Sequence, residues 1–257
     1  KSTNFILRIS GYPKLNFFRK FFWKFFSKLL FQVTCPSRDL INQLNIQNIF
    51  QKEKVKFLPD PILNIKDFAE KKWESIDKYN LKRKYFVSVG RLTRQKNFEY
   101  LIDEFKKFSD ENSDFDLLIF GEGELKQKLI YKIEKLNLSK KIFLMGHSNN
   151  VFKFMKKAEA FILSSLWEDP GFVIIEAAMS DLFIISSNCK NGPSEFLNSG
   201  KGGILFANNK NSALYEALKK FLVEKEKKIK KVLTKKNCSN YTLFKHYVLL
   251  KQILTNY

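Results

Sequence analysis

Short apolar runs alternate with amphipathic stretches from residue 85 onward, and this alternation constrains the fold more than any other feature of the sequence. The runs end near a glycine or a polar turn, as buried strands do, and the stretches between them repeat their apolar residues at helical spacing. The expected strands are 85–89, 116–120, 142–146, 160–163, 183–186 and 203–206. Strands that alternate with helices predict an α/β fold, with a doubly wound parallel sheet of the Rossmann type and helices on both faces.

The first part of the chain has strands of its own. The chain has 257 residues, enough for more than one domain. Short strands are expected at 4–9 and 55–58, and the polar, Lys-rich stretch 64–84 has the composition of an interdomain linker. We therefore expect a separate N-terminal part over 1–63 and a main domain that begins at residue 85.

Missing motifs argue against several classes of enzyme. The sequence has no G-x-S-x-G, H-E-x-x-H, Walker A or G-x-G-x-x-G pattern, so hydrolases, zinc proteases, P-loop enzymes and nicotinamide enzymes are not expected. Cys35, Cys189 and Cys238 are far apart and lack metal-ligand spacing. They predict free thiols in a reducing compartment, and no metal site is expected.

The stretch 15–31 combines phenylalanine and basic residues in a chain whose net charge is +20. On a helix, one face would hold Phe18, Phe21, Phe22, Phe25, Phe26 and Leu29. The other face would hold Asn16, Arg19, Lys20, Lys24, Ser27 and Lys28. Such a helix is typical of one lying in an anionic membrane interface, with too many charges to span a bilayer. An ordinary core helix with a solvated basic face is the equally weighted alternative.

Phosphorylated substrates and nucleic acids are the other partners that a basic chain attracts. The lysines are scattered over helix faces, and no DNA- or RNA-binding module is visible, so no nucleic-acid partner is expected. Salt-sensitive DNA binding would instead favour that class.

A pair of glutamates follows the expected strand 160–163. Pro170 and Gly171 interrupt the chain, so Glu168 should lie on a loop and Glu176 about a turn and a half into the next helix. A solvated Glu is the ordinary alternative, but Glu176 stands between apolar residues, where a carboxylate needs a partner or a ligand. The two carboxylates can accept hydrogen bonds from hydroxyls, and the helix N-terminus beside them attracts an anion. Together they predict a sugar-nucleotide site.

Three further loops follow strand ends. In the loop 90–97, Arg91 and Lys96 could clamp a diphosphate, and Asn97 is expected to cap the helix that follows. The loop 121–124 has glycines that allow a ligand close to the backbone, and the loop 191–195 opens another helix. Each loop alone could be ordinary solvated surface. Their shared position at one edge of the sheet, where α/β folds bind ligands, favours a common site.

These loops carry a resemblance to a known family. The elements are G-R-L at 90–92 followed by K-N at 96–97, F-G-E-G-E-L at 120–125, W-E-D-P-G-F-V-I-I-E-A at 167–177, and N-G-P-S-E-F-L with G-G-I-L-F from 191 to 206. In this order and spacing they resemble the nucleotide-binding half of the retaining glycosyltransferases of family 4, also called group 1.

The resemblance implies the GT-B fold, in which two Rossmann-like domains face each other across a cleft. It implies a partial N-terminal, acceptor-side domain over 1–63, a linker over 64–84 and a nucleotide-sugar-binding domain over 85–235. A C-terminal helix within 236–257 would pack back on the N-terminal part. The family's first strands, with their glycine-rich loop and often a catalytic His, have no counterpart, so the chain is expected to start inside that domain.

The resemblance also implies roles for residues. Arg91 and Lys96 match the cations that hold the donor diphosphate, and Glu168 matches the acid near the donor sugar; these three form the catalytic set. The matching donor-binding positions are Gly90, Gly121, Glu122, Gly123, His147, Gly171, Phe172, Val173, Glu176 and Glu195. The family's usual E-G-F-G reads Glu168-Asp169-Pro170-Gly171 here, and this variant alters the loop beside the donor sugar.

The function that the resemblance implies is transfer of a sugar, with retention and without a metal or cofactor, from a nucleotide sugar, with UDP as the expected nucleotide. The expected acceptor is a glycan or polyprenyl-linked molecule of the lipopolysaccharide, capsule or O-antigen type. With the basic aromatic helix, this implies a cytoplasmic protein peripheral at the inner face of the cell membrane. A noncatalytic sugar-nucleotide-binding module, or an inactive fragment, is the alternative.

Overall fold

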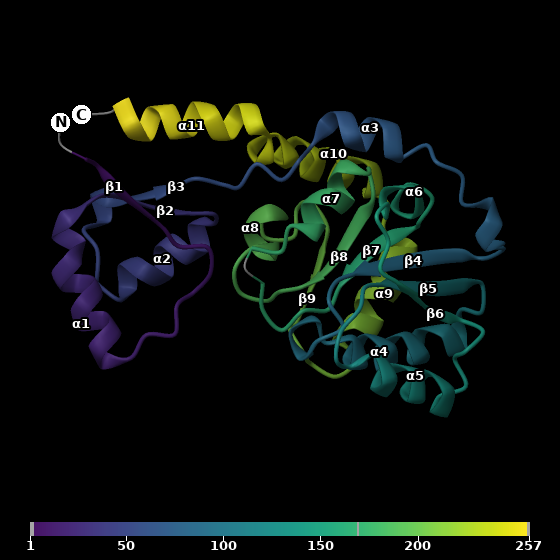
Figure 1. Cartoon of the computed structure of the whole chain (residues 1–257). Helices are drawn as coiled ribbons and strands as arrows, with labels where there is room; N and C mark the ends of the chain where they lie inside the picture. Colours follow the sequence, from purple (N-terminus) through teal and green to yellow (C-terminus); the bar gives the residue numbers. More distant parts are fainter. Residues whose placement is uncertain (1–2, 169, 256–257) are drawn as a thin grey trace. The chain divides into compact units, whose positions relative to one another are not determined.

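The computed structural model describes residues 3–168 and 170–255 (Figure 1). The chain divides into two compact units. One joins the residues up to Leu63 with those from Ser239 onward, and the other is Asn64–Cys238. Each unit is built around a parallel sheet of its own.

The larger unit has a six-stranded sheet in the order β6-β5-β4-β7-β8-β9, with all neighbours parallel. The strands are β4 (Lys84–Val89), β5 (Phe115–Phe120), β6 (Ile142–Gly146), β7 (Ala160–Leu163), β8 (Phe183–Ser187) and β9 (Ile204–Phe206). The chain runs outward from β4 to β6 and then returns to the other side of β4 as β7. The predicted doubly wound sheet is confirmed, and its order reverses between β4 and β7.

Helices cover both faces of this sheet (Figure 1). They are α3 (Ile65–Lys71), α4 (Phe98–Glu111), α5 (Lys126–Lys135), α6 (Phe152–Met155), α7 (Val173–Met179), α8 (Pro193–Phe196), α9 (Ala213–Val223) and α10 (Lys227–Asn237), with 3-10 turns η3 (Asp77–Tyr79) and η4 (Arg94–Lys96). In α4, Phe98, Leu101, Ile102, Phe105 and Phe108 are buried at helical spacing and pack on the sheet.

Residues 64–84, expected as a linker, belong to the larger unit and hold α3 and η3. Phe68 is buried with its ring edge-on to Phe152, at 5.2 Å between centroids, and Ile76 is also buried. These apolar side chains outweigh the polar composition of the stretch because they have a surface to pack against. The linker prediction is therefore wrong.

Two local predictions also differ from the structure. Asn97 is at the N-cap position of α4, but its side chain makes no capping hydrogen bond. Its backbone is left-handed, with φ 53°, and its side chain donates instead to Asn209 Oδ1 at 3.0 Å. Asn tolerates this conformation better than most residues, which suits it to end the η4 turn. Glu176 lies in the first turn of α7, earlier in the helix than expected, because the helix begins only at Val173.

The smaller unit has a three-stranded sheet in the order β1-β2-β3, formed by β1 (Phe5–Arg8), β2 (Leu30–Cys35) and β3 (Val55–Phe57). Its helices are α1 (Phe17–Phe26), α2 (Arg38–Ile46) and α11 (Leu243–Thr255), with 3-10 turns η1 (Ser27–Leu29), η2 (Lys52–Lys54) and η5 (Cys238–Tyr241). Hydrogen bonds that attach the residues around α11 include one from Leu63 N to Tyr241 O at 3.1 Å and one between His246 Nδ1 and Pro59 O at 2.7 Å.

Helix α1 exposes its aromatic face. Its phenylalanines are 49–79 % exposed, and only Trp23 turns inward, against Phe50 at 5.6 Å. The expected helix 15–31 is shorter in the structure, since Leu30 and Phe31 belong to β2. Because the phenylalanines are exposed within this chain, the core-helix alternative does not describe α1 here. None of the helices in the described residues is long and apolar enough to cross a membrane.

Candidate functional site

The loops that follow β4, β5 and β6 are joined at the carboxyl edge of the larger sheet. Gly90 N donates to Phe120 O at 2.9 Å, and Gly121 N donates to Gly146 O at 2.8 Å. Gly121 has φ 140°, and a Cβ there would lie 1.9 Å from Gly90 O. Any other residue at 121 would therefore push these loops apart. This edge includes the point between β4 and β7 where the strand order reverses, and sheets of this kind bind ligands at such points.

A pocket of about 430 Å³ opens among these loops. This volume falls in the range of small-molecule sites. The predicted donor-site residues that line it are Gly90, Arg91, Gly121, Glu122, His147 and Glu176. They come from the loops after three strands and from α7, so the fold gathers positions that are distant in the sequence.

Glu176 faces this pocket with an unpaired carboxylate. Burial raises its pKa above the usual value. Within residues 3–168 and 170–255, no side-chain hydrogen bond or ion pair reaches this carboxylate. A half-buried carboxylate without a partner is costly, and hydroxyl donors from a ligand would relieve that cost.

Lys96 and Glu168 form an ion pair beside the pocket. Lys96 Nζ lies 2.6 Å from Glu168 Oε1, and the Glu168 side chain is only 3 % exposed. Ser165 Oγ donates to the same carboxylate oxygen at 2.5 Å. A Cβ at Gly90 would lie 2.9 Å from Lys96 Cε, so the glycine makes room for the lysine chain. The pair ties the loop after β4 to the loop after β7.

The surroundings of Arg91 differ from those of Lys96, which is paired with Glu168. Its side chain is exposed at the rim of the pocket and, among the described residues, it has no carboxylate partner. The site therefore offers one free guanidinium and one ammonium that is already paired. A planar guanidinium can bind a phosphate through two parallel hydrogen bonds.

The other predicted positions do not line the pocket. Gly171 has φ 74° and leaves room for Glu168, because a Cβ there would lie 2.9 Å from Glu168 Cγ. Gly123 packs on the Leu92 backbone. The remaining positions begin or lie in helices: Phe172 and Val173 at α7, and Glu195 in α8. Asp169, quoted with this motif, lies outside the described residues.

The structure adds serines that the motif analysis did not single out. Ser165 holds Glu168, Ser187 Oγ donates to Ser165 O at 2.7 Å, and Ser164 Oγ donates to Lys96 O at 2.7 Å. A signal was present: two small hydroxyl residues stand directly after the apolar strand 160–163. Their hydrogen bonds fix both members of the ion pair.

Comparison with known proteins gives one family match. The family described as Glycosyl transferases group 1 matches residues 70–237. The match covers the sheet of the larger unit, with its pocket and the ion pair.

Two curated relatives and one solved structure extend this likeness. A UDP-Gal:alpha-D-GlcNAc-diphosphoundecaprenol alpha-1,3-galactosyltransferase of Escherichia coli is 33% identical over 82% of this chain and 57% of its own. An N-acetylgalactosamine-N,N'-diacetylbacillosaminyl-diphospho-undecaprenol 4-alpha-N-acetylgalactosaminyltransferase of Campylobacter jejuni is 28% identical over 86% of this chain and 60% of its own. The crystal structure of Anabaena HepE in complex with UDP has a TM-score of 0.78 at 14% identity, over 98% of this chain and 71% of that one. The chain thus spans little more than half the length of these curated relatives.

Proposed function

Because this chain belongs to the group 1 glycosyl transferases, with their GT-B fold, we propose that it moves a sugar from a nucleotide-sugar donor to a lipid-linked or polysaccharide acceptor. The observation that carries the proposal is the pocket at the carboxyl edge of the sheet, where the unpaired Glu176 carboxylate and the free Arg91 guanidinium face one space. The carboxylate can accept hydrogen bonds from hydroxyls, and the guanidinium can bind phosphate. A nucleotide sugar has both hydroxyls and phosphates.

The donor that we propose is a UDP-sugar. Its support is the UDP in the HepE complex and the UDP-Gal in the name of the E. coli relative. In this proposal Glu176 accepts hydrogen bonds from the ribose hydroxyls, and Arg91 binds the diphosphate. His147, whose Nε2 lies 3.0 Å from Asn149 Oδ1 at the rim, would lie near the base.

The chemistry follows from charge. As the bond from the sugar C1 to the diphosphate breaks, negative charge collects on the diphosphate oxygens. Arg91 and the Lys96 ammonium, oriented by Glu168, stabilise that charge, and no step in this scheme requires a metal ion. The acceptor hydroxyl oxygen bonds to C1 on the face that the diphosphate leaves, and its proton passes to the departing diphosphate oxygen. Attack on that face retains the configuration. We assign no enzyme nucleophile.

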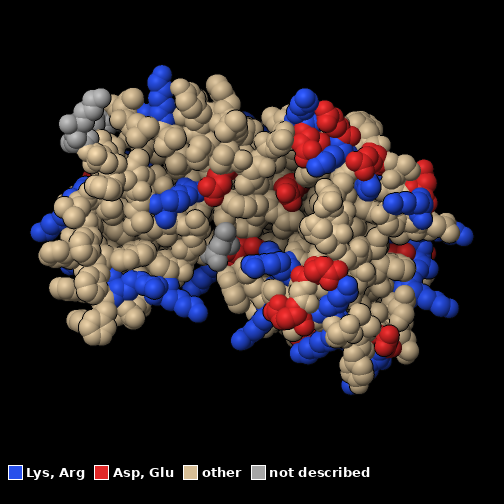
Figure 2. Space-filling view, viewed as in Figure 1, with Lys and Arg blue, Asp and Glu red and all other residues tan. Residues whose placement is uncertain are grey.

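We further propose that α1 brings the protein to an anionic membrane surface, at the inner face of the cell membrane. Phenylalanines exposed on a helix without acidic residues fit a lipid interface. Figure 2 displays basic and uncharged side chains where α1 lies, with no acidic ones in view. The lipid-linked acceptors named for the two curated relatives support this location.

A thermal-shift titration with UDP, GDP and ADP tests the donor site. A nucleotide at about 100 times its dissociation constant adds about 2.7 kcal/mol to the stability, which is readily measured. We expect a shift with UDP that Glu176→Ala reduces. Glu134→Ala is the matched control, since Glu134 is an exposed glutamate on α5. No shift with any nucleotide would contradict the proposal, and binding without sugar transfer would favour a noncatalytic binding module.

A further inference from the structure

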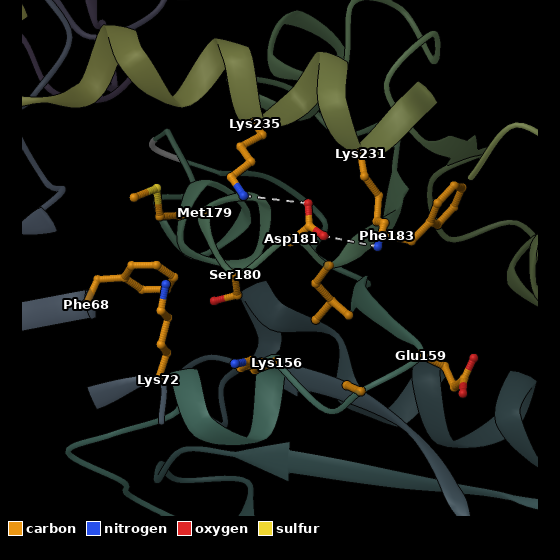
Figure 3. A pocket seen from close by; sticks show the side chains of 12 residues that line it. Phe68, Lys72, Lys156, Glu159, Met179, Ser180, Asp181, Phe183, Lys231 and Lys235 are labelled. Atoms are coloured by element: carbon orange, nitrogen blue, oxygen red, sulfur yellow. Dashed lines mark hydrogen bonds and ion pairs between the residues drawn. The ribbon is translucent and has the colours of Figure 1, made fainter. Parts of the chain in front are cut away.

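A second pocket lies at the opposite edge of the larger sheet, by the amino ends of β7 and β8 (Figure 3). It has a volume of about 340 Å³. Lysines enter it from three segments: Lys72 at the end of α3, Lys156 at the end of α6, and Lys231 and Lys235 from α10. None of the motifs described above includes these residues.

The charges in this pocket do not balance. Four lysines face two carboxylates, Asp181 and Glu159. Asp181 is already engaged, with its oxygens 3.3 Å from Lys231 Nζ and 3.8 Å from Lys235 Nζ. Glu159 lies across the pocket from Lys72 in Figure 3. An excess of two positive charges remains, and it falls on the side of Lys72 and Lys156.

Lys72 and Lys156 share an aromatic support in place of a carboxylate. Lys72 Nζ lies 5.4 Å from the Trp73 ring centroid and 5.0 Å from that of Phe68, and the Lys156 ammonium lies over the same Trp73 ring. Within the described part of the chain, neither ammonium has a carboxylate partner. Two cations held by one indole repel each other, and a bound anion would relieve that repulsion.

Two further observations agree with an anion here. The pKa of Lys156 is lowered, first by loss of solvent and then by the nearby cations Lys72 and Lys157. The Ser180 hydroxyl at the pocket wall already donates to Glu176 O at 2.9 Å, so the lysines remain the available donors. A phosphomonoester carries a charge of about −1.5 to −2 at pH 7, which matches the excess positive charge.

We propose that this pocket is a second ligand site, separate from the nucleotide pocket, which binds the phosphate group of a small phosphomonoester through Lys72 and Lys156. The two pockets are separate because they lie at opposite ends of α7. Met179 and Ser180 line it at the end of α7, whereas Glu176, in the first turn of α7, lines the nucleotide pocket. The inference does not depend on the sugar-transfer proposal.

The test is an NMR titration of the whole ¹⁵N-labelled chain with glycerol 3-phosphate. We expect saturable amide shifts at Ser180, Asp181 and Lys231, and affinity reduced about tenfold or more in K72A/K156A. K66A/K157A removes the same charge from the same two segments at exposed positions outside the pocket, and should change the affinity by no more than about twofold. Shifts confined to Gly90 and Arg91, or equal weakening in both double variants, would overturn the site.

A second arm identifies the source of the phosphate. Vesicles containing phosphatidic acid carry the same monoester group on a lipid. Binding of these vesicles that is lost in K72A/K156A but kept in K66A/K157A, without glycerol 3-phosphate shifts, would assign the site to a lipid headgroup. If neither probe binds through Lys72 and Lys156, the site does not exist. The thermal unfolding temperature of each variant without ligand verifies that the fold is intact.

Discussion

Lys96 and Glu168, which are 72 positions apart in the sequence, form an ion pair of 2.6 Å that joins the loops after β4 and β7. The lysine side chain is 14 % exposed and the glutamate 3 %. In such a setting each charge needs the other, because an unpaired buried charge is far more costly than an unpaired charge in water. The pair therefore holds together the edge of the sheet on which the proposed nucleotide pocket, lined by Gly90, Arg91 and Glu176, depends.

The first prediction concerns this pair. Removing one partner, as in Glu168→Leu, should lower the free energy of unfolding by about 3–5 kcal/mol, since Lys96 is left without its counter-charge. The double variant Lys96→Met/Glu168→Leu should recover much of that loss, because no buried charge remains. Urea unfolding measures both.

An exposed pair provides the control for this prediction. Lys106 and Asp110 on α4 are also 2.6 Å apart, but Asp110 is 56 % exposed. Asp110→Ala should cost no more than about 1 kcal/mol. Equal losses in Asp110→Ala and Glu168→Leu would mean that burial does not make the Lys96–Glu168 pair special.

Apolar periodicity was enough to predict the larger sheet, because each buried strand and each helix face is a local pattern. The buried residues of α4, such as Leu101 and Phe105, stand at the spacing expected of a helix that packs on a sheet. The loops of the proposed nucleotide pocket were also predictable, since strand ends in a parallel sheet meet at one edge. Gly121 and Glu176 reach one pocket for this reason.

Contacts between distant segments were not predictable. Lys96 and Glu168 each suit a ligand, and nothing local indicates that they pair with each other. Phe68 packs on Phe152, which is far along the chain, so composition alone made its segment look like a linker. Asn97 is a good helix cap by type, yet the end of the preceding turn sets its left-handed backbone.

The second prediction concerns Arg91. Arg91→Ala should reduce sugar transfer by about 10²-fold, as expected when one charge-stabilising group is lost at a leaving group. The folded state should keep its stability, since the side chain is exposed and has no hydrogen bond or ion pair within the described residues. Transfer assays with a UDP-sugar, together with thermal unfolding, measure the two effects.

Arg94 is the matched control for Arg91. It is an exposed arginine three positions later that does not line the pocket. Arg94→Ala removes the same charge and should leave transfer nearly unchanged. If the two variants lose activity equally, Arg91 acts only through net charge and not as a phosphate ligand.

The third prediction concerns the pH dependence of Glu176. Burial raises its pKa in the folded protein above the ordinary value of 4.5. At a pH between 4.5 and the raised pKa, the folded state therefore binds a proton that the unfolded state does not. Stability therefore falls as the pH rises from 4.5 through the raised pKa, and it stays lower above it. Glu176→Gln should stabilise the protein at pH 7, and this gain should vanish near pH 4.

The same variant separates stability from function. Glu176→Gln should bind UDP more weakly even though it is more stable, because the amide replaces a charged acceptor with a neutral one. Denaturation between pH 4 and pH 8 and UDP titration at pH 7 measure the two quantities. Glu134→Gln, on the exposed surface of α5, should change neither. Lower stability of Glu176→Gln at pH 7 would show that the carboxylate has a partner in the folded protein.

The last prediction concerns α1. Lys20→Glu/Lys24→Glu reverses two charges on its basic face and should abolish co-sedimentation with anionic vesicles, while Phe18→Ser/Phe25→Ser should weaken it by removing exposed apolar contact. Binding by the parent protein should fall as salt is raised, since the attraction to the lipid surface is screened. The control Lys135→Glu/Lys140→Glu makes the same charge change at exposed positions of the larger unit. If that control loses vesicle binding as fully as the α1 variant does, net charge alone draws the protein to the surface. If the phenylalanine variant also binds like the parent, α1 does not enter the interface, and its aromatic face must serve another contact.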